Sequence, residues 1–118
     1  TYLNNMVNEM SDGSLTIDKK APGELVGAFE VFDAVSSGQA DMYHAADYYF
    51  IGQHPAFAYF AAVPFGGTAQ ELSNWYLHGG GQDLHNQLGE IFNMKMFLAG
   101  NSGSQSARKS TPPPTLTV

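Results

Sequence analysis

The histidines are the residues whose chemistry first suggests a site, because imidazole nitrogens bind metal ions and transfer protons. His78 and His85 are seven positions apart, and the glycines at positions 79–81 lie between them. A zinc site needs further ligands at motif spacing, which these two histidines lack. His44 and His54 lie in separate segments. The sequence therefore favours solvated or capping histidines over a metal centre.

The carboxylates are also scattered. Asp12, Asp18, Asp33 and Asp41 stand at predicted turns and helix ends, where short acidic side chains cap backbone N–H groups. Glu24 follows a turn glycine, and capping of the next helix is favoured over a position in a cleft. The spacing does not assemble a nucleophile, a base and an orienting partner. An enzyme is thus the least favoured class of function.

Neutral polar groups are the stronger candidates for a binding site. Tyr48 and Tyr49 are adjacent in a predicted passage from strand to loop, so they are expected to point in opposite directions, one of them into a pocket. A second group follows a predicted strand, where open α/β sheets bind ligands. Its members are Asn101, Ser102, Ser104 and Gln105. These groups suit a small carboxylate or a coordinated cation, and a simple polar turn remains an alternative.

Composition limits the choice of partner. The net charge is -6 with only 5 Lys and Arg residues, which excludes a basic surface for nucleic acid or an anionic membrane. Cysteine is absent, so disulfide scaffolds, zinc ribbons and thiol chemistry are excluded. The 118 residues suffice for one small domain. No apolar run approaches the roughly 20 residues that a bilayer span requires.

Apolar periodicity predicts four helices around these candidates. The first covers residues 2–12 and ends at Gly13, and the second covers residues 27–38 with Phe29 and Phe32 on one apolar face. Thr68 and Glu71 form a capping box that starts the third, and the glycines at positions 79–81 are expected to end it and to break it from the fourth. The fourth covers residues 82–92, with the apolar side chains Leu84, Leu88 and Ile91 on one face.

Strands are predicted between the helices. Residues 14–20 alternate apolar and polar side chains, and residues 94–100 suit a short strand. Residues 42–46 suit a short buried strand followed by a loop, although the Ala and Asp residues of this segment also allow a helix. The apolar run at residues 54–65 suits a short helical turn followed by a buried strand. Strands that alternate with helices predict an α/β fold with a mostly parallel sheet flanked by helices.

The order of several sequence blocks resembles a known family. The blocks are EMSDGSLTI, APGELVGAFEVFDAVSSGQADM, AADYYFIGQHPAFAYFAAVPFG, WYLHGGGQDL and AGNSGSQ. Together they closely resemble the solute-binding subunits of tripartite ATP-independent periplasmic (TRAP) transporters, in the branch that binds α-keto acids and related monocarboxylates. The resemblance extends from Thr1 to about Gln105, and several blocks in the right order are more specific than any one alone.

The resemblance implies a function in transport. It implies a secreted, periplasmic binding protein with a type II periplasmic-binding-protein-like fold of two α/β lobes. Such a protein closes over a small organic acid such as pyruvate and delivers it to the membrane permease subunits of the TRAP transporter. The resemblance also implies a bound cation, usually sodium, with Gln105 among the cation and substrate contacts. Tyr48, Tyr49 and Asn101 are added as weaker substrate-binding candidates.

The resemblance also implies that parts of the family fold lie outside this sequence. A first strand is expected before Thr1, together with a signal peptide, and a second lobe is expected to supply an arginine, a tryptophan and a glutamate to the site. Residues 1–105 are therefore interpreted as a partial first lobe. Unpaired strand edges and exposed apolar surface predict poor solubility or dimerisation of the isolated chain.

The basic, proline-rich residues 106–118 depart from the family pattern. Codons for residues 107–115, ARKSTPPPT, can be chosen so that a shifted frame reads RKEINTPAD, a sequence of the kind the family has here. A small deletion near Gln105 is one hypothesis, which makes this tail non-native or disordered. The alternative is a natural proline-rich tail on a free-standing α/β protein-interaction module, read by a proline-binding domain.

Overall fold

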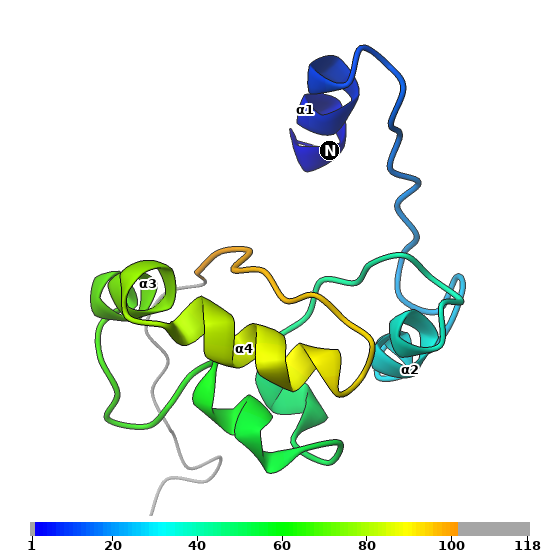
Figure 1. The fold of residues 1–118 in the computed structure, drawn as a ribbon. Coiled ribbons are helices and arrows are strands. Elements are labelled where there is room, and N and C mark those ends of the chain that lie inside the picture. Colours follow the sequence, from blue (N-terminus) through cyan, green and yellow to red (C-terminus); the bar gives the residue numbers. More distant parts are fainter. Residues whose placement is uncertain (1, 102–118) are drawn as a thin grey trace, which may run out of the picture.

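The structure, a computed structural model, describes residues 2–101. Within this range every regular element is helical (Figure 1). The elements are the α-helices α1 (Tyr2–Met10), α2 (Val31–Ser36), α3 (Ala69–His78) and α4 (Gly81–Glu90), and the 3-10 helices η1 (Asp47–Phe50) and η2 (Pro55–Tyr59). Among the described residues, no helix is both long enough and apolar enough to span a membrane.

The helix α1 forms where the periodicity predicts it. The Gly13 N–H donates to the Asn8 carbonyl at 2.8 Å, and the positive φ of Gly13, +78°, closes the helix as predicted. α1 lies apart from the other helices in Figure 1, and none of its residues is buried. Asn4 Nδ2 donates to the Ile17 carbonyl at 3.0 Å, which ties the helix to the segment that follows. The predicted apolar face of α1 is therefore open to solvent.

The helix α2 is shorter than the helix predicted over residues 27–38. A turn precedes it, and its first residue is Val31. Phe32 and Ala34 are buried, whereas Phe29 is 71% exposed. The predicted apolar face is correct inside the helix and wrong for Phe29, because that residue lies in the turn, outside the helical periodicity.

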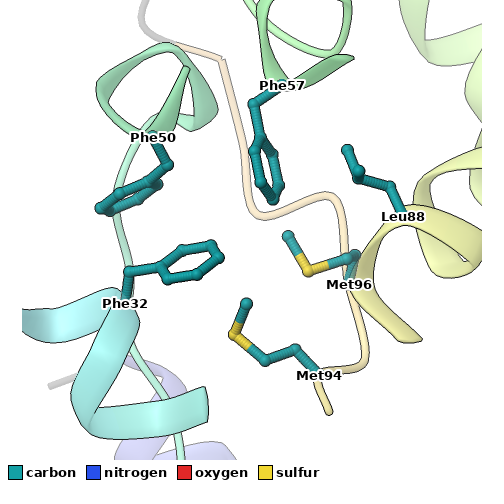
Figure 2. Close-up of a cluster of buried hydrophobic side chains, with 6 residues drawn as sticks. All are labelled: Phe32, Phe50, Phe57, Leu88, Met94 and Met96. Atoms are coloured by element: carbon teal, nitrogen blue, oxygen red, sulfur yellow. The ribbon is translucent and has the colours of Figure 1, made fainter. Parts of the chain in front are cut away.

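A cluster of aromatic, leucine and methionine side chains forms the core (Figure 2). The Phe32 and Phe57 rings meet edge to face with 5.5 Å between their centroids, and both side chains are almost completely buried. The full cluster consists of Phe32, Phe50, Phe57, Leu88, Met94 and Met96. Burial of each such side chain contributes roughly 1.5–3 kcal/mol, so this cluster holds together segments that are far apart in sequence.

The helices α3 and α4 form a pair joined by a short glycine turn. Thr68 Oγ1 accepts from the Glu71 N–H at 3.3 Å, and Glu71 Oε2 accepts from the Thr68 N–H at 2.7 Å, which confirms the predicted capping box. The break predicted in the glycine run is also confirmed. Gly80 has a φ of +87°, a left-handed backbone conformation that residues other than glycine rarely adopt. The helix α4 begins at the next residue.

The predicted sheet is not confirmed. Residues 14–20, 42–46 and 94–100 have no regular secondary structure, and no strand is assigned among the described residues. A strand exists only where its N–H and C=O groups pair with a neighbouring strand, and the described segments do not provide this pairing for one another. Burial nevertheless alternates along the third segment, because Met94 and Met96 are buried and the residues beside them are exposed.

The third of these segments packs closely on α4 because position 89 is glycine. A Cβ at Gly89 would lie 2.7 Å from both the Met94 carbonyl oxygen and Met96 Cγ. Nearer the start of the same helix, Gln82 Nε2 donates to the Met96 carbonyl at 2.7 Å. α4 therefore serves as the surface on which residues 94–96 are fixed.

The predicted helical turn near residue 55 is present, but the strand after it is not. His54 Nδ1 accepts from the Ala56 N–H at 3.1 Å and so caps η2. Phe57 is buried, Tyr59 is 69% exposed, and the chain then bends through residues 60–61. The apolar run is accommodated by a 3-10 helix that buries only part of it.

The predictions for the tail at residues 106–118 lie outside the described residues.

Candidate functional site

The 3-10 helix η1 carries both tyrosines that were predicted to contact a ligand. Their rings lie side by side, with 4.6 Å between centroids and 55° between planes. The prediction that Tyr48 and Tyr49 point in opposite directions is wrong, because successive residues of a 3-10 helix are separated by about 120° rather than by the 180° of a strand. Tyr49 is 54% exposed, and its ring meets the edge of Phe29 at 5.7 Å.

Tyr48 lines an open hollow of about 280 Å³, called here the Tyr48 hollow. The other lining residues are Ile51, Ala58, Ala61, Ala62 and Pro64. These side chains are apolar, so Tyr48 is the lining residue of the hollow that carries a polar side-chain group. Ligand sites typically combine an apolar wall with a few polar groups in about 300–1,000 Å³, and the Tyr48 hollow has the size of one part of such a site.

The other two predicted site residues are placed less fully. Asn101 is exposed and ends the segment that follows α4, directly after Gly100. Gln105 lies outside the described residues, as do Ser102 and Ser104. The structure thus brings Tyr48 and Tyr49 together. Of the polar group after residue 100, only Asn101 lies among the described residues.

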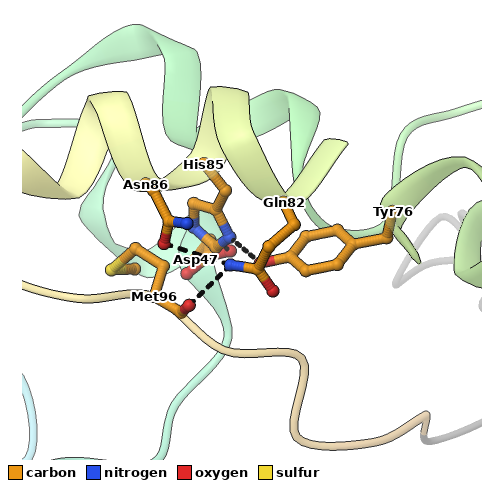
Figure 3. A network of polar contacts seen from close by, with 6 residues as sticks. All are labelled: Asp47, Tyr76, Gln82, His85, Asn86 and Met96. Atoms are coloured by element: carbon orange, nitrogen blue, oxygen red, sulfur yellow. Dashed lines mark hydrogen bonds and ion pairs between the residues drawn. The ribbon is translucent and has the colours of Figure 1, made fainter. Parts of the chain in front are cut away.

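His85 is the centre of a buried polar network that sequence reasoning missed (Figure 3). The residue is only 4% exposed, so its interpretation as a solvated or capping histidine is wrong. Its Nδ1 forms a hydrogen bond with the Tyr76 hydroxyl, and its Nε2 lies 3.2 Å from Asp47 Oδ2. Three elements meet in this network, because Asp47 starts η1, Tyr76 belongs to α3 and His85 belongs to α4.

The surroundings of Tyr76 and His85 indicate which of the two side chains donates the hydrogen bond between them. Burial, with a smaller contribution from the charge of Asp47, raises the pKa of Tyr76 to about 12, so the hydroxyl stays protonated at neutral pH. In a neutral imidazole this hydroxyl donates to Nδ1, which places the imidazole proton on Nε2, facing the carboxylate of Asp47. A bare Nε2 lone pair would repel the carboxylate.

The contact between His85 and Asp47 is electrostatic rather than a well-aligned hydrogen bond. The 3.2 Å between His85 Nε2 and Asp47 Oδ2 is within the range of an ion pair. However, Nε2 has no partner among the described residues at an angle that would make a hydrogen bond. Both side chains are largely buried, at 5% and 14% exposure, so solvent screens the contact only weakly. The contact therefore still orients the Asp47 carboxylate.

A signal for the buried position of His85 was present in the sequence. Leu88 follows it by three positions and Gly81 precedes it by four, which is the spacing of one helical face. The predicted apolar face of Leu84, Leu88 and Ile91 is correct for Leu88 and wrong for Leu84 and Ile91, which are 52% and 66% exposed. The buried face of α4 is shifted toward Gly81 and His85.

The described residues were also tested for a cation site. They contain no group of three or more His, Asp, Glu or Cys side chains that could hold a metal ion. His44 and His78 are exposed, and His54 caps η2, which agrees with the predicted roles of these three residues. The donor set of the predicted cation is centred on Gln105 and so lies outside this range.

Comparison with known proteins identifies the family. A family model described as "Bacterial extracellular solute-binding protein, family 7" matches residues 1–113. The chain belongs to this family. The resemblance seen in the sequence blocks is confirmed, and the family is one of solute-binding proteins rather than enzymes.

One curated relative of this solute-binding chain is a monocarboxylate 2-oxoacid-binding periplasmic protein from a Nostoc species. The two are 40% identical over 99 residues, which are 84% of this chain and 27% of the relative. Among solved structures, a TRAP transporter solute-binding protein from Bordetella bronchiseptica matches with a TM-score of 0.82 and 30% identity over 86% of this chain. That protein is a dimer of mixed occupancy with copurified calcium and picolinate.

Two further solved relatives hold pyruvate. The TRAP periplasmic solute-binding protein from Pseudoalteromonas atlantica, with bound sodium and pyruvate, is 37% identical at a TM-score of 0.67. Its counterpart from Colwellia psychrerythraea, with bound calcium and pyruvate, is 35% identical at the same TM-score. Each match covers 76% of this chain. The chain spans about a quarter to a third of the length of these relatives, between 27% and 30%.

Proposed function

We propose that this chain is part of the solute-binding subunit of a TRAP transporter. In this proposal, residues 1–105 form part of the first lobe of a periplasmic protein that captures a small organic acid and delivers it to the membrane permease subunits. The family membership and the share of the relatives' length that the chain covers support this assignment.

The proposed substrate class is an α-keto acid such as pyruvate. The observation that carries this choice is the bound pyruvate in the two relatives from Pseudoalteromonas and Colwellia, at 37% and 35% identity. The name of the Nostoc relative specifies the same class, monocarboxylate 2-oxoacids. The net charge of -6 requires that an anion be held by local contacts rather than by the overall field.

A bound cation is proposed to assist, since the two pyruvate complexes contain sodium and calcium respectively. The amide oxygen of Gln105 is the proposed ligand from this chain, because hard cations take oxygen ligands. Tyr48, Tyr49 and Asn101 are proposed as substrate contacts. The Tyr48 hollow, which is lined by Tyr48 and by apolar residues, supports this role for Tyr48.

Calorimetric titration of the longer protein that contains this chain tests the substrate. We expect heat with pyruvate and other small α-keto acids, and much weaker binding of the dicarboxylate succinate. Removal of sodium and calcium, by dialysis against a chelator in a potassium buffer, is expected to weaken the binding of pyruvate. Absence of binding to every α-keto acid, in the presence of either cation, would overturn the substrate class.

Two variants test the proposed contacts. Gln105→Ala is expected to weaken pyruvate binding and to remove most of its dependence on sodium. Tyr48→Phe removes one hydroxyl and is expected to weaken binding about tenfold, which corresponds to about 1.4 kcal/mol. Tyr59→Phe is the matched control, because Tyr59 is 69% exposed and lies outside the Tyr48 hollow. Equal affinity in all three variants would exclude the proposed contacts.

The α/β lobe is proposed as well. Residues 14–20, 42–46 and 94–100 would pair as strands once neighbouring strands of the longer protein are present, and the alternating burial of Met94 and Met96 supports this. Amide hydrogen exchange tests the idea. Residues 95–100 are expected to exchange quickly in this chain and at least 100-fold more slowly in the longer protein, as paired strands do. Fast exchange in both would count against a sheet.

A further inference from the structure

The Asp47 side chain connects the polar network to the tyrosines of η1. Asp47 is the first residue of η1 and immediately precedes Tyr48 and Tyr49. Its Oδ2 lies 3.2 Å from Nε2 of His85, which is held from the other side by Tyr76 (Figure 3). The position of η1 is therefore linked to the pair of helices α3 and α4 through one imidazole ring.

The start of η1 lacks a side-chain cap. Its N-cap residue is Ala46, which has no side-chain group to cap the helix, and no side-chain cap hydrogen bond is formed. Asp47 is a good capping residue type, yet its carboxylate is turned toward His85 instead. At the other end, Phe50 is anchored in the core. Tyr48 and Tyr49 lie between these two anchors.

The His85 ring is itself held rigidly. Phe60 stacks on it with 4.2 Å between ring centroids and 10° between planes, and the Tyr76 ring meets it edge-on at 5.7 Å. With 4% exposure, the imidazole has almost no solvent in which to reorient. A ring that is stacked on one face and contacted at both nitrogens can hold Asp47 in one place.

We propose that His85 is a positioning residue for the ligand: through Asp47 it fixes η1 so that Tyr48 and Tyr49 are presented to the organic acid. His85 does not touch the ligand in this arrangement. The inference rests on the proposed function, in which the two tyrosines contact the organic acid. Preorganised contacts bind more tightly because less ordering remains to be done on binding.

Binding of pyruvate to the longer protein tests the proposal. His85→Phe keeps a ring against Phe60 but removes both nitrogens, and about tenfold weaker binding is expected. Asp47→Ala should weaken binding to the same extent. Asp47→Asn keeps an oxygen for the Nε2 proton and should bind within about threefold of the native protein, since a neutral acceptor retains part of the contact.

Leu88→Ala provides the matched control for lost stability. Leu88 lies on α4 in the core, 6% exposed, and its truncation is expected to lower the unfolding free energy by about 2–5 kcal/mol. This variant should bind pyruvate like the native protein. The proposal is overturned if Leu88→Ala weakens binding as much as His85→Phe does, or if His85→Phe binds normally.

Amide hydrogen exchange tests the same link without a ligand. In His85→Phe, exchange at residues 47–53 is expected to speed up about tenfold or more relative to the native protein, while residues 81–90 of α4 keep their native rates. A uniform change in both ranges, or no change, overturns the positioning role. If pyruvate does not bind the native protein, the proposed function fails and this exchange experiment alone decides the role of His85.

Discussion

The Phe60 ring lies flat on the imidazole of His85, with 4.2 Å between the ring centroids and 10° between the ring planes. Phe60 follows directly after η2, and His85 lies in the middle of α4. The stack therefore joins the aromatic segment at residues 55–60 to the α3 and α4 pair. It also covers one face of the only buried histidine among the described residues.

Loss of this stack should destabilise the protein. Phe60→Leu keeps most of the apolar volume but removes the ring, and a decrease in unfolding free energy of about 0.5–1.5 kcal/mol is expected. Tyr59→Leu is the matched control, because Tyr59 is the adjacent aromatic residue and is 69% exposed. The control should change stability by less than about 0.5 kcal/mol. Urea unfolding of both variants gives the comparison, and equal losses would refute the importance of the stack.

Two tyrosine hydroxyls are predicted to affect stability in opposite directions. The Tyr76 hydroxyl is paired with His85, so Tyr76→Phe should lower the unfolding free energy by about 1–3 kcal/mol, because Nδ1 loses its partner. The Tyr43 hydroxyl is buried without a hydrogen-bond partner in the described part of the chain. Tyr43→Phe should leave stability unchanged or raise it by about 1 kcal/mol. Chemical unfolding of the two variants side by side tests this contrast.

Both hydroxyls should also make stability fall at alkaline pH. Burial raises the pKa of Tyr43 and of Tyr76 from 10.0 to about 12, and the charge of Asp47 adds to this effect. The unfolded chain therefore loses these protons at a lower pH than the folded chain does. Below pH 10 both hydroxyls are neutral in the folded and in the unfolded chain, so stability does not depend on their titration, and it falls progressively as the pH rises from about 10 to 12.

Tyrosinate absorbance and urea unfolding at stepped pH values check this prediction. Tyr43 and Tyr76 should both ionise late in the native protein, and the double variant Tyr43→Phe, Tyr76→Phe should have two fewer late-ionising tyrosines. The double variant should also lose less stability between pH 10 and 12. A titration in which every tyrosine ionises near its ordinary pKa of about 10 would show that the two hydroxyls are not buried as described.

Local signals in the sequence predicted the helices well. The capping box of Thr68 and Glu71, the periodicity of α1 and the glycines that end α1 and α3 act within a few residues, so they could be recognised without the fold. Strand pairing could not be established in this way, because it depends on partners that are distant in sequence. Residues 94–100 have the alternation of a strand but no described partner.

The candidate site shows the same division. Tyr48 and Tyr49 were selected by residue type and by resemblance, and the structure adds the Tyr48 hollow beside them. His85 was interpreted as solvated or capping because no further metal ligands lie at motif spacing, although the helical spacing to Leu88 places it on the buried face. Its partners Asp47 and Tyr76 are 38 and 9 positions away in sequence. Contacts of this kind arise from tertiary packing and leave no local pattern.

The close approach of α4 to the segment after it gives a final prediction. A Cβ at Gly89 would lie 2.7 Å from the Met94 carbonyl oxygen and from Met96 Cγ, so the backbone of residues 94–96 would have to move. Gly89→Ala improves helix propensity by roughly 1 kcal/mol, yet it forces a contact that costs roughly 1–3 kcal/mol. A net loss of stability is therefore expected, with faster exchange of the Met94 amide, whose N–H donates to the Gly89 carbonyl at 3.0 Å.

The glycine at position 52 is the control for this substitution. A Cβ at Gly52 would have no heavy atom within 4 Å, and the residue lies in an exposed turn. Gly52→Ala should therefore be neutral or slightly stabilising, because it reduces the entropy of the unfolded chain. If Gly89→Ala proves as stable as Gly52→Ala, residues 94–96 do not pack against α4 as the structure shows, and α4 cannot be the surface that fixes this segment.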